Sequence, residues 1–258
     1  NPVLRIGDQI ADVIEAHEPG VGRAEAKRRA VEALDLVRIP NAAARARSYA
    51  YQFSGGMRQR VMIAMAIACR PRLLIADEPT TALDVTIQAQ ILDLLESLRR
   101  ELGMAIVLIT HDIGLVARHA DRVAVMYSGR IVEEAPVKRL FARAAHPYSE
   151  ALIAAAPRVG GPRLPRLATI GGEPPRIDAP VPGCAFHPRC GRREGRVLCA
   201  TDVPVLAALA PGHRAACHFA DETRASAPPP AGTAGVTGSA DAAATATPLL
   251  QVTNLAKR

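Results

Sequence analysis

The sequence QFSGGMRQRVMIAMAIACRPRLLIADEPTTALDVTIQAQ, residues 52–90, decides how the rest of the chain is interpreted. Ser54 precedes two glycines and a long apolar run, which predicts a mostly buried helix with Ser54 as its N-cap. Gly55 and Gly56 let a ligand approach the free N–H groups of the first turn. Because a helix N-terminus carries partial positive charge, this position suits a phosphate.

The second half of the same stretch predicts a strand that ends in two acids. Leu73 to Ala76 is a short apolar run, typical of a parallel strand covered on both faces. Asp77 and Glu78 follow at its carboxyl end, where ligands of α/β sheets bind. Two carboxylates there can take the two roles of metal-assisted phosphoryl transfer: one binds Mg²⁺, and the other orients or deprotonates a water.

Three motifs carry a resemblance to a known family. FSGGMRQR (53–60) resembles the signature motif of the ABC ATPases, and LLIADEPTTALD (73–84) resembles their Walker B motif and D-loop. A strand that ends at Thr110-His111-Asp112 resembles their H-loop. Each motif alone is typical of an ordinary helix cap or a solvated strand end, but their order and spacing together favour the family. The sequence thus predicts an α/β fold, an ABC-type P-loop ATPase core with a helical subdomain and a small cysteine-containing C-terminal region.

The resemblance implies a role for each motif residue. ABC ATPases pair head to tail and trap ATP between the P-loop of one domain and the signature of the other. Asp77 would then hold Mg²⁺, and Glu78 would be the general base for the attacking water. His111 would contact the γ-phosphate, and Asp84 would communicate across the dimer. The residues that would bind the ATP of the partner domain are Ser54, Gly55, Gly56 and Met57, the last in place of the usual glutamine, as in related peptide-importer ATPases.

Composition narrows the class of protein. The chain has 258 residues, of which 49% are hydrophobic and 22% charged, as is ordinary for a globular protein. Its longest apolar run, residues 61–69, is too short to cross a bilayer. A net charge of +7 suits phosphate, lipid or nucleic acid. Aromatic residues are only 3% and do not alternate with basic ones, so we expect no nucleic-acid partner and a largely solvated arginine-rich surface.

Two parts of the family pattern are missing. No G-x-x-x-x-G-K-[ST] P-loop occurs in the sequence, and Asn1-Pro2 resembles the residues just after the Q-loop glutamine. We therefore expect a piece of a longer polypeptide that does not hydrolyse ATP by itself.

Periodicity gives the expected elements in order. Residues 1–53 are expected to be the helical subdomain that docks on membrane subunits in this family, with helices ending at Pro19-Gly20 and before Pro40. Residues 54–135 are expected to be the second half of the catalytic core. Its further elements are a helix capped by Asp84, a buried strand at 104–110, a short helix at 113–119 and strands at 122–127 and 130–133.

The segment 136–220 is expected to form a separate C-terminal region. A short helix is predicted at 138–143, and Pro147 suits the first position of the next helix. HPYSEALIAAAPR (146–158) resembles the start of the C-terminal region of oligopeptide and dipeptide importer ATPases.

Four cysteines in this region have the spacing C-x5-C-x8-C-x17-C; they are Cys184, Cys190, Cys199 and Cys217. Disulfides are disfavoured on the reducing side of the membrane, which leaves four unrelated thiols or a metal site. Without a C-x2-C pair a zinc ribbon is less natural. Some members of the resembled family hold a [4Fe–4S] cluster here, so iron–sulfur ranks first, no metal second and zinc third. We expect His187, His213 and His218 to be surface residues, with substitute ligands as the alternative, and Cys69 to pack as a small apolar side chain.

The end of the sequence changes character again. Residues 221–247 are mostly Ala, Pro, Thr, Gly and Ser and are expected to be a flexible linker. Residues 248–258 resemble the first strand of a second ABC ATPase domain, which would make the parent a tandem-fused subunit.

Together these features predict the nucleotide-binding subunit of a peptide importer, peripheral on the cytoplasmic face of the cell membrane. The implied partners are a second ABC ATPase domain, two membrane permease subunits and, indirectly, an extracytoplasmic substrate-binding protein. The alternatives are a nickel or glutathione importer, an ABC ATPase without a transporter, and a redox-sensing or structural role for residues 136–220. The HPY segment and the cysteines favour the importer, and the long coiled-coil insertion of the repair branch is absent from the sequence.

Overall fold

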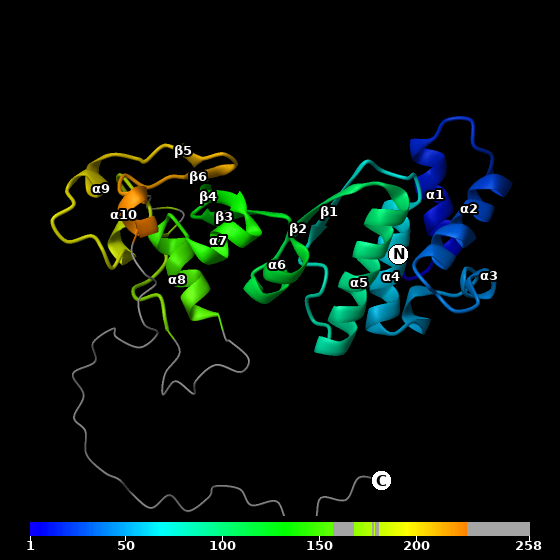
Figure 1. The fold of residues 1–258 in the computed structure, drawn as a ribbon. Helices are drawn as coiled ribbons and strands as arrows, with labels where there is room; N and C mark the ends of the chain where they lie inside the picture. The colour runs from blue at the N-terminus through cyan, green and yellow to red at the C-terminus, as the bar shows by residue number, and fades with distance from the viewer. Residues whose placement is uncertain (157–167, 177, 179–180, 226–258) are drawn as a thin grey trace, which may run out of the picture.

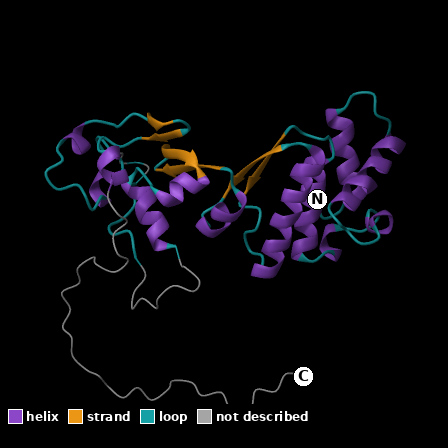
Figure 2. Ribbon diagram, viewed as in Figure 1, coloured by secondary structure: helices purple, strands orange, loops and turns teal. Residues whose placement is uncertain are grey.

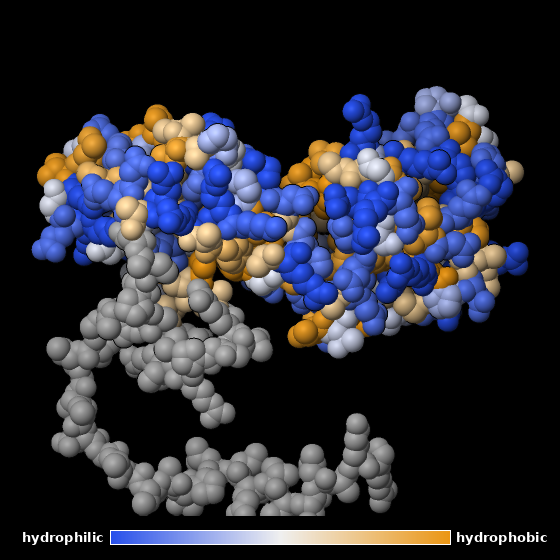
Figure 3. Space-filling view, in the orientation of Figure 1, coloured by the Kyte–Doolittle hydropathy of each residue, from blue (hydrophilic) through white to orange (hydrophobic). Residues whose placement is uncertain are grey.

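The structure is a computed structural model that describes residues 1–156, 168–176, 178 and 181–225. These residues form two lobes with a narrower middle, where β1 and β2 lie (Figures 1 and 3). We call residues 1–119 the N-terminal lobe and the described residues from 120 to 225 the C-terminal lobe. No described helix is long and apolar enough to cross a membrane.

The N-terminal lobe begins with a helical layer, as predicted (Figure 2). Its elements are α1 (Ile6–His17), α2 (Arg23–Leu36), α3 (Ala42–Arg45), a 3-10 turn (Ala50–Gln52) and α4 (Gly55–Ile67). Apolar residues at helical spacing are fully buried where these helices meet, among them Ile10, Ile14 and Leu34. The periodicity of the sequence therefore placed both α1 and α2 correctly.

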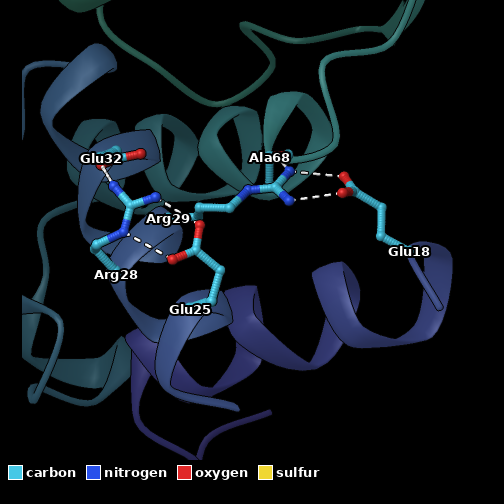
Figure 4. A network of polar contacts seen from close by, with 6 residues as sticks. All are labelled: Glu18, Glu25, Arg28, Arg29, Glu32 and Ala68. Atoms are coloured by element: carbon cyan, nitrogen blue, oxygen red, sulfur yellow. Dashed lines mark hydrogen bonds and ion pairs between the residues drawn. The ribbon is translucent and has the colours of Figure 1, made fainter. Parts of the chain in front are cut away.

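Arg29 of α2 ties the helical layer to the end of α4. Its guanidinium donates two hydrogen bonds to the carboxylate of Glu18, at 2.6 and 2.7 Å, and a third to the carbonyl of Ala68 at 3.1 Å (Figure 4). Next to it, Arg28 pairs with Glu25 and Glu32 on the same helix. Because Ala68 is the C-cap of α4, one arginine satisfies a carbonyl that the helix itself leaves free.

The middle of the chain forms the predicted βαβ unit. Strand β1 (Leu73–Asp77) pairs in parallel with β2 (Ala105–Ile109), and α5 (Val85–Leu102) connects them. The register places Asp77 opposite Ile109, so the ends of both strands lie at one edge. Helix α6 (Ile113–His119) follows directly. This edge positions the acids that follow β1 near the histidine that follows β2.

The two strands are less buried than their sequence predicts. On one face of the sheet, side chains remain 46–65% exposed: Leu73, Ile75, Val107 and Ile109. The opposite face is covered, with Leu74 and Ala76 nearly inaccessible. The expectation of two covered faces is therefore wrong for the part of the chain that the structure describes, because its helices pack on one side only.

The C-terminal lobe is built on an antiparallel sheet of order β3-β4-β6-β5. Its elements are β3 (Arg122–Tyr127), β4 (Arg130–Pro136), α7 (Val137–Ala142), α8 (Pro147–Ala155), a 3-10 turn (His187–Arg189), α9 (Leu198–Thr201), β5 (Ala207–Ala210), β6 (His213–Ala215) and α10 (Ala220–Ala225). The sequence predicted β3, β4, α7 and α8 but not β5 and β6. Since β4 pairs with β6, one sheet spans the boundary that we expected at residue 135.

The first residues of the expected linker, 221–225, are helical, so the prediction is wrong for them. Residues 220–225 form α10, in which Thr223 is buried and its hydroxyl donates to the carbonyl of Phe219 at 3.2 Å. Glu222 also forms an ion pair with Arg196 at 2.5 Å, which attaches the helix to the preceding loop. The rest of the expected linker and the expected strand at 248–258 lie outside the described residues.

Candidate functional site

Glu78 and His111 meet at the carboxyl edge of β1 and β2. The Oε1 atom of Glu78 lies 2.8 Å from Nδ1 of His111, and its Oε2 accepts a hydrogen bond from the hydroxyl of Thr81 at 3.1 Å. The backbone N–H of Glu78 donates to the carbonyl of Ile109 at 2.9 Å. The structure thus brings together the two residues that the sequence predicted as general base and γ-phosphate contact.

The backbone of Glu78 is unusual for a residue with a side chain. Its φ is +46°, in the left-handed region that residues other than glycine rarely adopt. Such conformations persist where the surroundings hold them and are frequent at functional sites. Here the contacts with Ile109, Thr81 and His111 hold it.

The pair also shifts the acidity of both groups. The hydrogen bond from His111 lowers the pKa of the Glu78 carboxyl below its ordinary value. Reciprocally, the hydrogen bond and charge of Glu78 raise the pKa of the His111 imidazole. The His111 side chain is 86% exposed, so solvent screens the pair strongly. At neutral pH the carboxylate is ionised and able to accept a proton.

The two aspartates of the motif occupy different positions. Asp77 is the exposed last residue of β1, at the same edge as Glu78. Asp84 is the N-cap of α5 and accepts a hydrogen bond from the N–H of Ile87 at 2.9 Å, as its predicted capping role requires. Asp77 is therefore open to solvent at the carboxyl edge of the sheet, whereas Asp84 stabilises a helix start.

The signature residues form the first turn of α4. The hydroxyl of Ser54, the N-cap, accepts from the N–H of Met57 at 3.4 Å. Gly56 lies so close to α5 that an added Cβ would be 2.7 Å from Cγ2 of Ile87. The same atom on Gly55 would be 3.7 Å from Leu83. Gly56 is thus required by packing against the start of α5, in addition to any ligand contact.

The four cysteines of the C-terminal region line one small cavity of about 20 Å³, together with His146 and Phe186. The N–H of Cys184 donates to the carbonyl of Cys199 at 2.9 Å, which joins two of the cysteine segments. Gly183 makes this approach possible, because a Cβ there would lie 2.6 Å from the carbonyl oxygen of Cys199. All five cysteines, Cys69 included, are free thiols in the described residues.

The environment of these thiols is apolar with arginines nearby. Burial raises the pKa of the Cys184 and Cys199 thiols and brings that of Cys217 to about 11. Arg193 and Arg196 also line the cavity. Without a bound metal, the three shifted thiols are therefore protonated at neutral pH.

The spacing of the thiols bears on which metal they suit. Among the described residues, no group of three or more His, Cys, Asp or Glu side chains lies close enough to hold one metal ion. A single tetrahedral zinc needs four sulfurs at about 2.3 Å from one centre. In an iron–sulfur cluster each cysteine binds a different iron, so more widely spaced sulfurs are accepted. Thiolates are donors that either group can take, but the cavity of about 20 Å³ between these four is smaller than a [4Fe–4S] cluster.

Sequence reasoning missed a buried polar network beside this cavity. The Glu133 carboxylate, fully buried on β4, accepts from the N–H groups of Ala145 and His146 at 2.7 and 3.0 Å. It also lies 2.8 Å from Nε2 of His213, which is fully buried, so the expected surface position of His213 is wrong. His187 and His218 are half-buried. The sequence did contain one signal of this network. Side chains alternate along a strand, so of the two successive glutamates in β4, Glu133 and Glu134, one faces inward.

In comparison with known proteins, each lobe matches a different family model. Residues 2–81 match the family "ABC transporter", and residues 132–196 match "Oligopeptide/dipeptide transporter, C-terminal region". The solved structure of a dimeric bacterial ABC transporter cassette covers 53% of this chain and 58% of its own at 32% identity, with a TM-score of 0.46.

Curated relatives extend the match across most of the described residues. A probable peptide ABC transporter ATP-binding protein of Sinorhizobium fredii is 51% identical over 86% of this chain and 65% of its own length. The oligopeptide transport ATP-binding protein OppD of Salmonella typhimurium is 48% identical over 84% and 63%. OppD of Mycobacterium tuberculosis is 50% identical over 84% and 35%. The chain therefore spans less than two thirds of the length of these relatives. With its signature, Walker B and HPY segments in family order, the chain belongs to the ATP-binding subunits of oligopeptide ABC transporters.

Proposed function

We propose that this chain contributes to Mg²⁺-dependent ATP hydrolysis that drives peptide import, as part of a nucleotide-binding subunit at the cytoplasmic face of the membrane. The observation that carries the proposal is the Glu78–His111 pair at the shared edge of β1 and β2. The peptide cargo rests on the relatives, which are named as peptide or oligopeptide transport proteins.

The residues at this edge divide the work of hydrolysis. Bound Mg²⁺–ATP supplies the phosphoryl group and the metal that neutralises its charge. Asp77, exposed at the end of β1, would hold the metal. Glu78, whose lowered pKa leaves it ionised at neutral pH, accepts the proton of the attacking water. Nδ1 of His111 is occupied by Glu78, so Nε2 is the nitrogen left to contact the γ-phosphate.

The first turn of α4 would bind a different ATP. Its free N–H groups and positive helix end suit the γ-phosphate carried by a second ABC ATPase domain. A Cβ on Gly55 would make only an ordinary contact with Leu83, and Met57 and Ser54 complete the turn. Asp84 fixes the start of α5 immediately behind this turn, which is how it would communicate across the pair.

Two surfaces would meet partners. Parallel sheets are normally covered by helices on both faces, so we infer that the apolar face of Ile75 and Val107 is covered by a helical layer of the same ATPase core. The helical layer at residues 1–53 would dock on the two membrane permease subunits, which in turn engage an extracytoplasmic binding protein.

Replacement of the base tests the catalytic assignment. In the complete transporter, Glu78→Gln should retain ATP binding but suppress hydrolysis at one site, because the amide cannot accept the proton. Glu101→Gln, an exposed glutamate on α5, is the matched control and should leave turnover unchanged. Unchanged phosphate release by the Glu78 variant would contradict the assignment. The 258-residue chain alone, which has no P-loop motif in its sequence, should show no Mg²⁺-dependent turnover.

We propose further that Cys184, Cys190, Cys199 and Cys217 hold a [4Fe–4S] cluster, with Zn²⁺ as the alternative. The support is that all four line one cavity with arginines beside them, which suits a group of net negative charge. Bound in this way, the cluster would staple a loop-rich segment.

Metal content tests this second assignment. Protein prepared without oxygen should be brown and contain iron, and Cys190→Ser should lose both colour and iron. Cys69→Ser, a cysteine outside the cavity, is the matched control and should keep them. Colourless protein with one zinc per chain would select the other metal, and metal-free protein would refute the assignment.

A further inference from the structure

Thr81 places a hydroxyl group on the second carboxylate oxygen of Glu78. Oε1 of Glu78 lies 2.8 Å from Nδ1 of His111, and Oε2 accepts from Oγ1 of Thr81 at 3.1 Å. His111 lies between β2 and α6, whereas Thr81 lies in the loop between β1 and α5. The carboxylate is thus held at each of its two oxygens by a different segment of the chain.

A second contact on the carboxylate fixes what a single contact leaves free. The last torsion of a glutamate side chain is broad, so a carboxylate with one hydrogen bond can still turn about it. A bond on the other oxygen fixes the plane of the group. Each carboxylate oxygen can accept two hydrogen bonds, so one position on each oxygen remains for a water molecule. Thr81 therefore sets the direction of the remaining lone pairs of Glu78 without occupying all of them.

The loop holds Thr81 itself in one place. Its N–H donates to the carbonyl of Glu78 at 3.2 Å, which closes a turn with Pro79 and Thr80 at its centre. Both central residues are buried, so the turn is anchored in the N-terminal lobe. Glu78 and Ala82 have φ values of +46° and +63°, in the left-handed region, at the two ends of this segment. Because a β-branched side chain has few χ1 states, the turn fixes where the Thr81 hydroxyl points.

The contact between Thr81 and Glu78 contributes little to the stability of the fold. Thr81 is exposed, and its hydroxyl bonds a side chain rather than the backbone. Such a bond replaces bonds to water, so the net gain in folding free energy is small. Loss of the hydroxyl should therefore leave folding unchanged while it frees the Glu78 carboxylate to turn.

We propose that Thr81 is a positioning residue for the general base: its hydroxyl orients the Glu78 carboxylate toward the water that attacks ATP. The proposal rests on the function proposed above for Glu78. Thr81 acts through Glu78 and keeps its own proton throughout, since the proton of the water passes to a lone pair of Glu78. A base held at both oxygens needs no rearrangement before it accepts this proton.

Removal of the hydroxyl at constant size tests the proposal in the complete transporter. Thr81→Val should lower about tenfold the part of ATP turnover that Glu78→Gln abolishes, because a misdirected base loses rate. KM for ATP and the unfolding temperature should stay unchanged, since the hydroxyl binds no nucleotide and supports no core. Thr81→Ser keeps the donor and should restore most of the turnover. Thr86→Val, the same change at an exposed threonine on α5, is the matched control and should leave turnover unchanged.

A double substitution shows whether Thr81 acts through Glu78. Glu78→Gln/Thr81→Val should hydrolyse ATP as fast as Glu78→Gln alone, since the hydroxyl has no base left to orient. A slower double variant would mean that Thr81 serves another site, and a raised KM with earlier unfolding would mean that it holds the loop.

Either of these results would overturn the proposal, as would a Thr81→Ser variant no faster than Thr81→Val. Unchanged turnover in Glu78→Gln would refute the assignment of the base itself. Suppressed turnover in Glu78→Gln beside wild-type turnover in Thr81→Val would refute this inference alone.

Discussion

The two lobes present their polar groups in opposite ways. In the N-terminal lobe, the Glu78–His111 pair lies at an open edge, with the His111 side chain 86% exposed and a sheet face uncovered nearby. In the C-terminal lobe, Glu133, His146 and His213 are at most 1% exposed, and four half-buried thiols line a cavity together with His146. One site is open to partners, and the other is closed by its own chain.

This difference in exposure indicates which interactions stabilise the geometry of each site. Exposed pairs are screened by water and contribute little to stability, so the geometry at Glu78 must be completed by what binds there. Buried charged networks are costly to break, so the wall of the cysteine cavity is fixed by the fold itself. If the proposed function is right, the first site depends on assembly with partners, and the second depends on the integrity of one lobe.

The largest expected effect comes from breaking the buried hydrogen-bond network around Glu133. Glu133→Gln should lower the free energy of unfolding of the C-terminal lobe by about 3–5 kcal/mol, because it leaves buried donors and His213 without their carboxylate. Chemical denaturation followed by tyrosine fluorescence measures this, since Tyr127 and Tyr148 pack in that lobe. The matched control is the next residue of β4, Glu134, which pairs with Arg122 at 2.7 Å at the surface.

Glu134→Gln should cost less than about 1 kcal/mol, as surface ion pairs do. Equal losses in the two variants would mean that burial does not distinguish these glutamates, and the contrast between a closed and an open site would fail.

The second-largest expected effect is destabilisation of the C-terminal lobe by acid. His146 has its folded pKa at about 4, against about 6.5 when unfolded. Above pH 6.5 both states are neutral at this residue; below it the unfolded state takes up the proton, so stability falls until about pH 4. The loss should reach about 3 kcal/mol in metal-free protein. His146→Asn keeps a side-chain cap on α8 and should lack this part of the acid sensitivity. If the wild type and the variant lost stability equally in acid, burial of His146 would not be the cause of the loss.

The sequence predicted a feature of either lobe well where the residues involved are close together in the chain, and poorly where they are far apart. The signature, the strand ending in Asp77 and the α5 cap are each continuous in sequence. The local pattern therefore correctly predicted Ser54 and Asp84 as helix N-caps and Glu78 as the residue after the strand. The partner of Glu133 is His213, 80 residues away, and local periodicity carries no information on such a pairing. Strands β5 and β6 were missed for a related reason, since they have only four and three residues, and β6 pairs with the distant β4 while β5 pairs with β6.

A smaller effect should separate the two signature glycines. Gly56→Ala places a Cβ 2.7 Å from Cγ2 of Ile87 and should destabilise the N-terminal lobe by about 1–2 kcal/mol through overpacking. Gly55→Ala meets only Leu83 at 3.7 Å and should be neutral or slightly stabilising, because alanine favours the helix. Thermal unfolding of both variants, with Gly56→Ala/Ile87→Ala as the relieving double substitution, checks the packing role. Failure of the double variant to recover stability would argue that Gly56 is required for another reason.

The smallest effect belongs to the open pair itself. The hydrogen bond to Glu78 raises the pKa of His111, so its stabilising contribution is complete below the ordinary histidine value and is lost as pH rises through the raised one. Glu78 has a lowered pKa, so the same contribution is also lost when pH falls through that value. A nuclear magnetic resonance titration of His111 should give a midpoint above 6.5 in nucleotide-free protein, returning toward 6.5 in Glu78→Gln and in 1 M salt. A midpoint that neither change moves would mean that the pair is not formed at this open edge, and that His111 stays free until nucleotide binds.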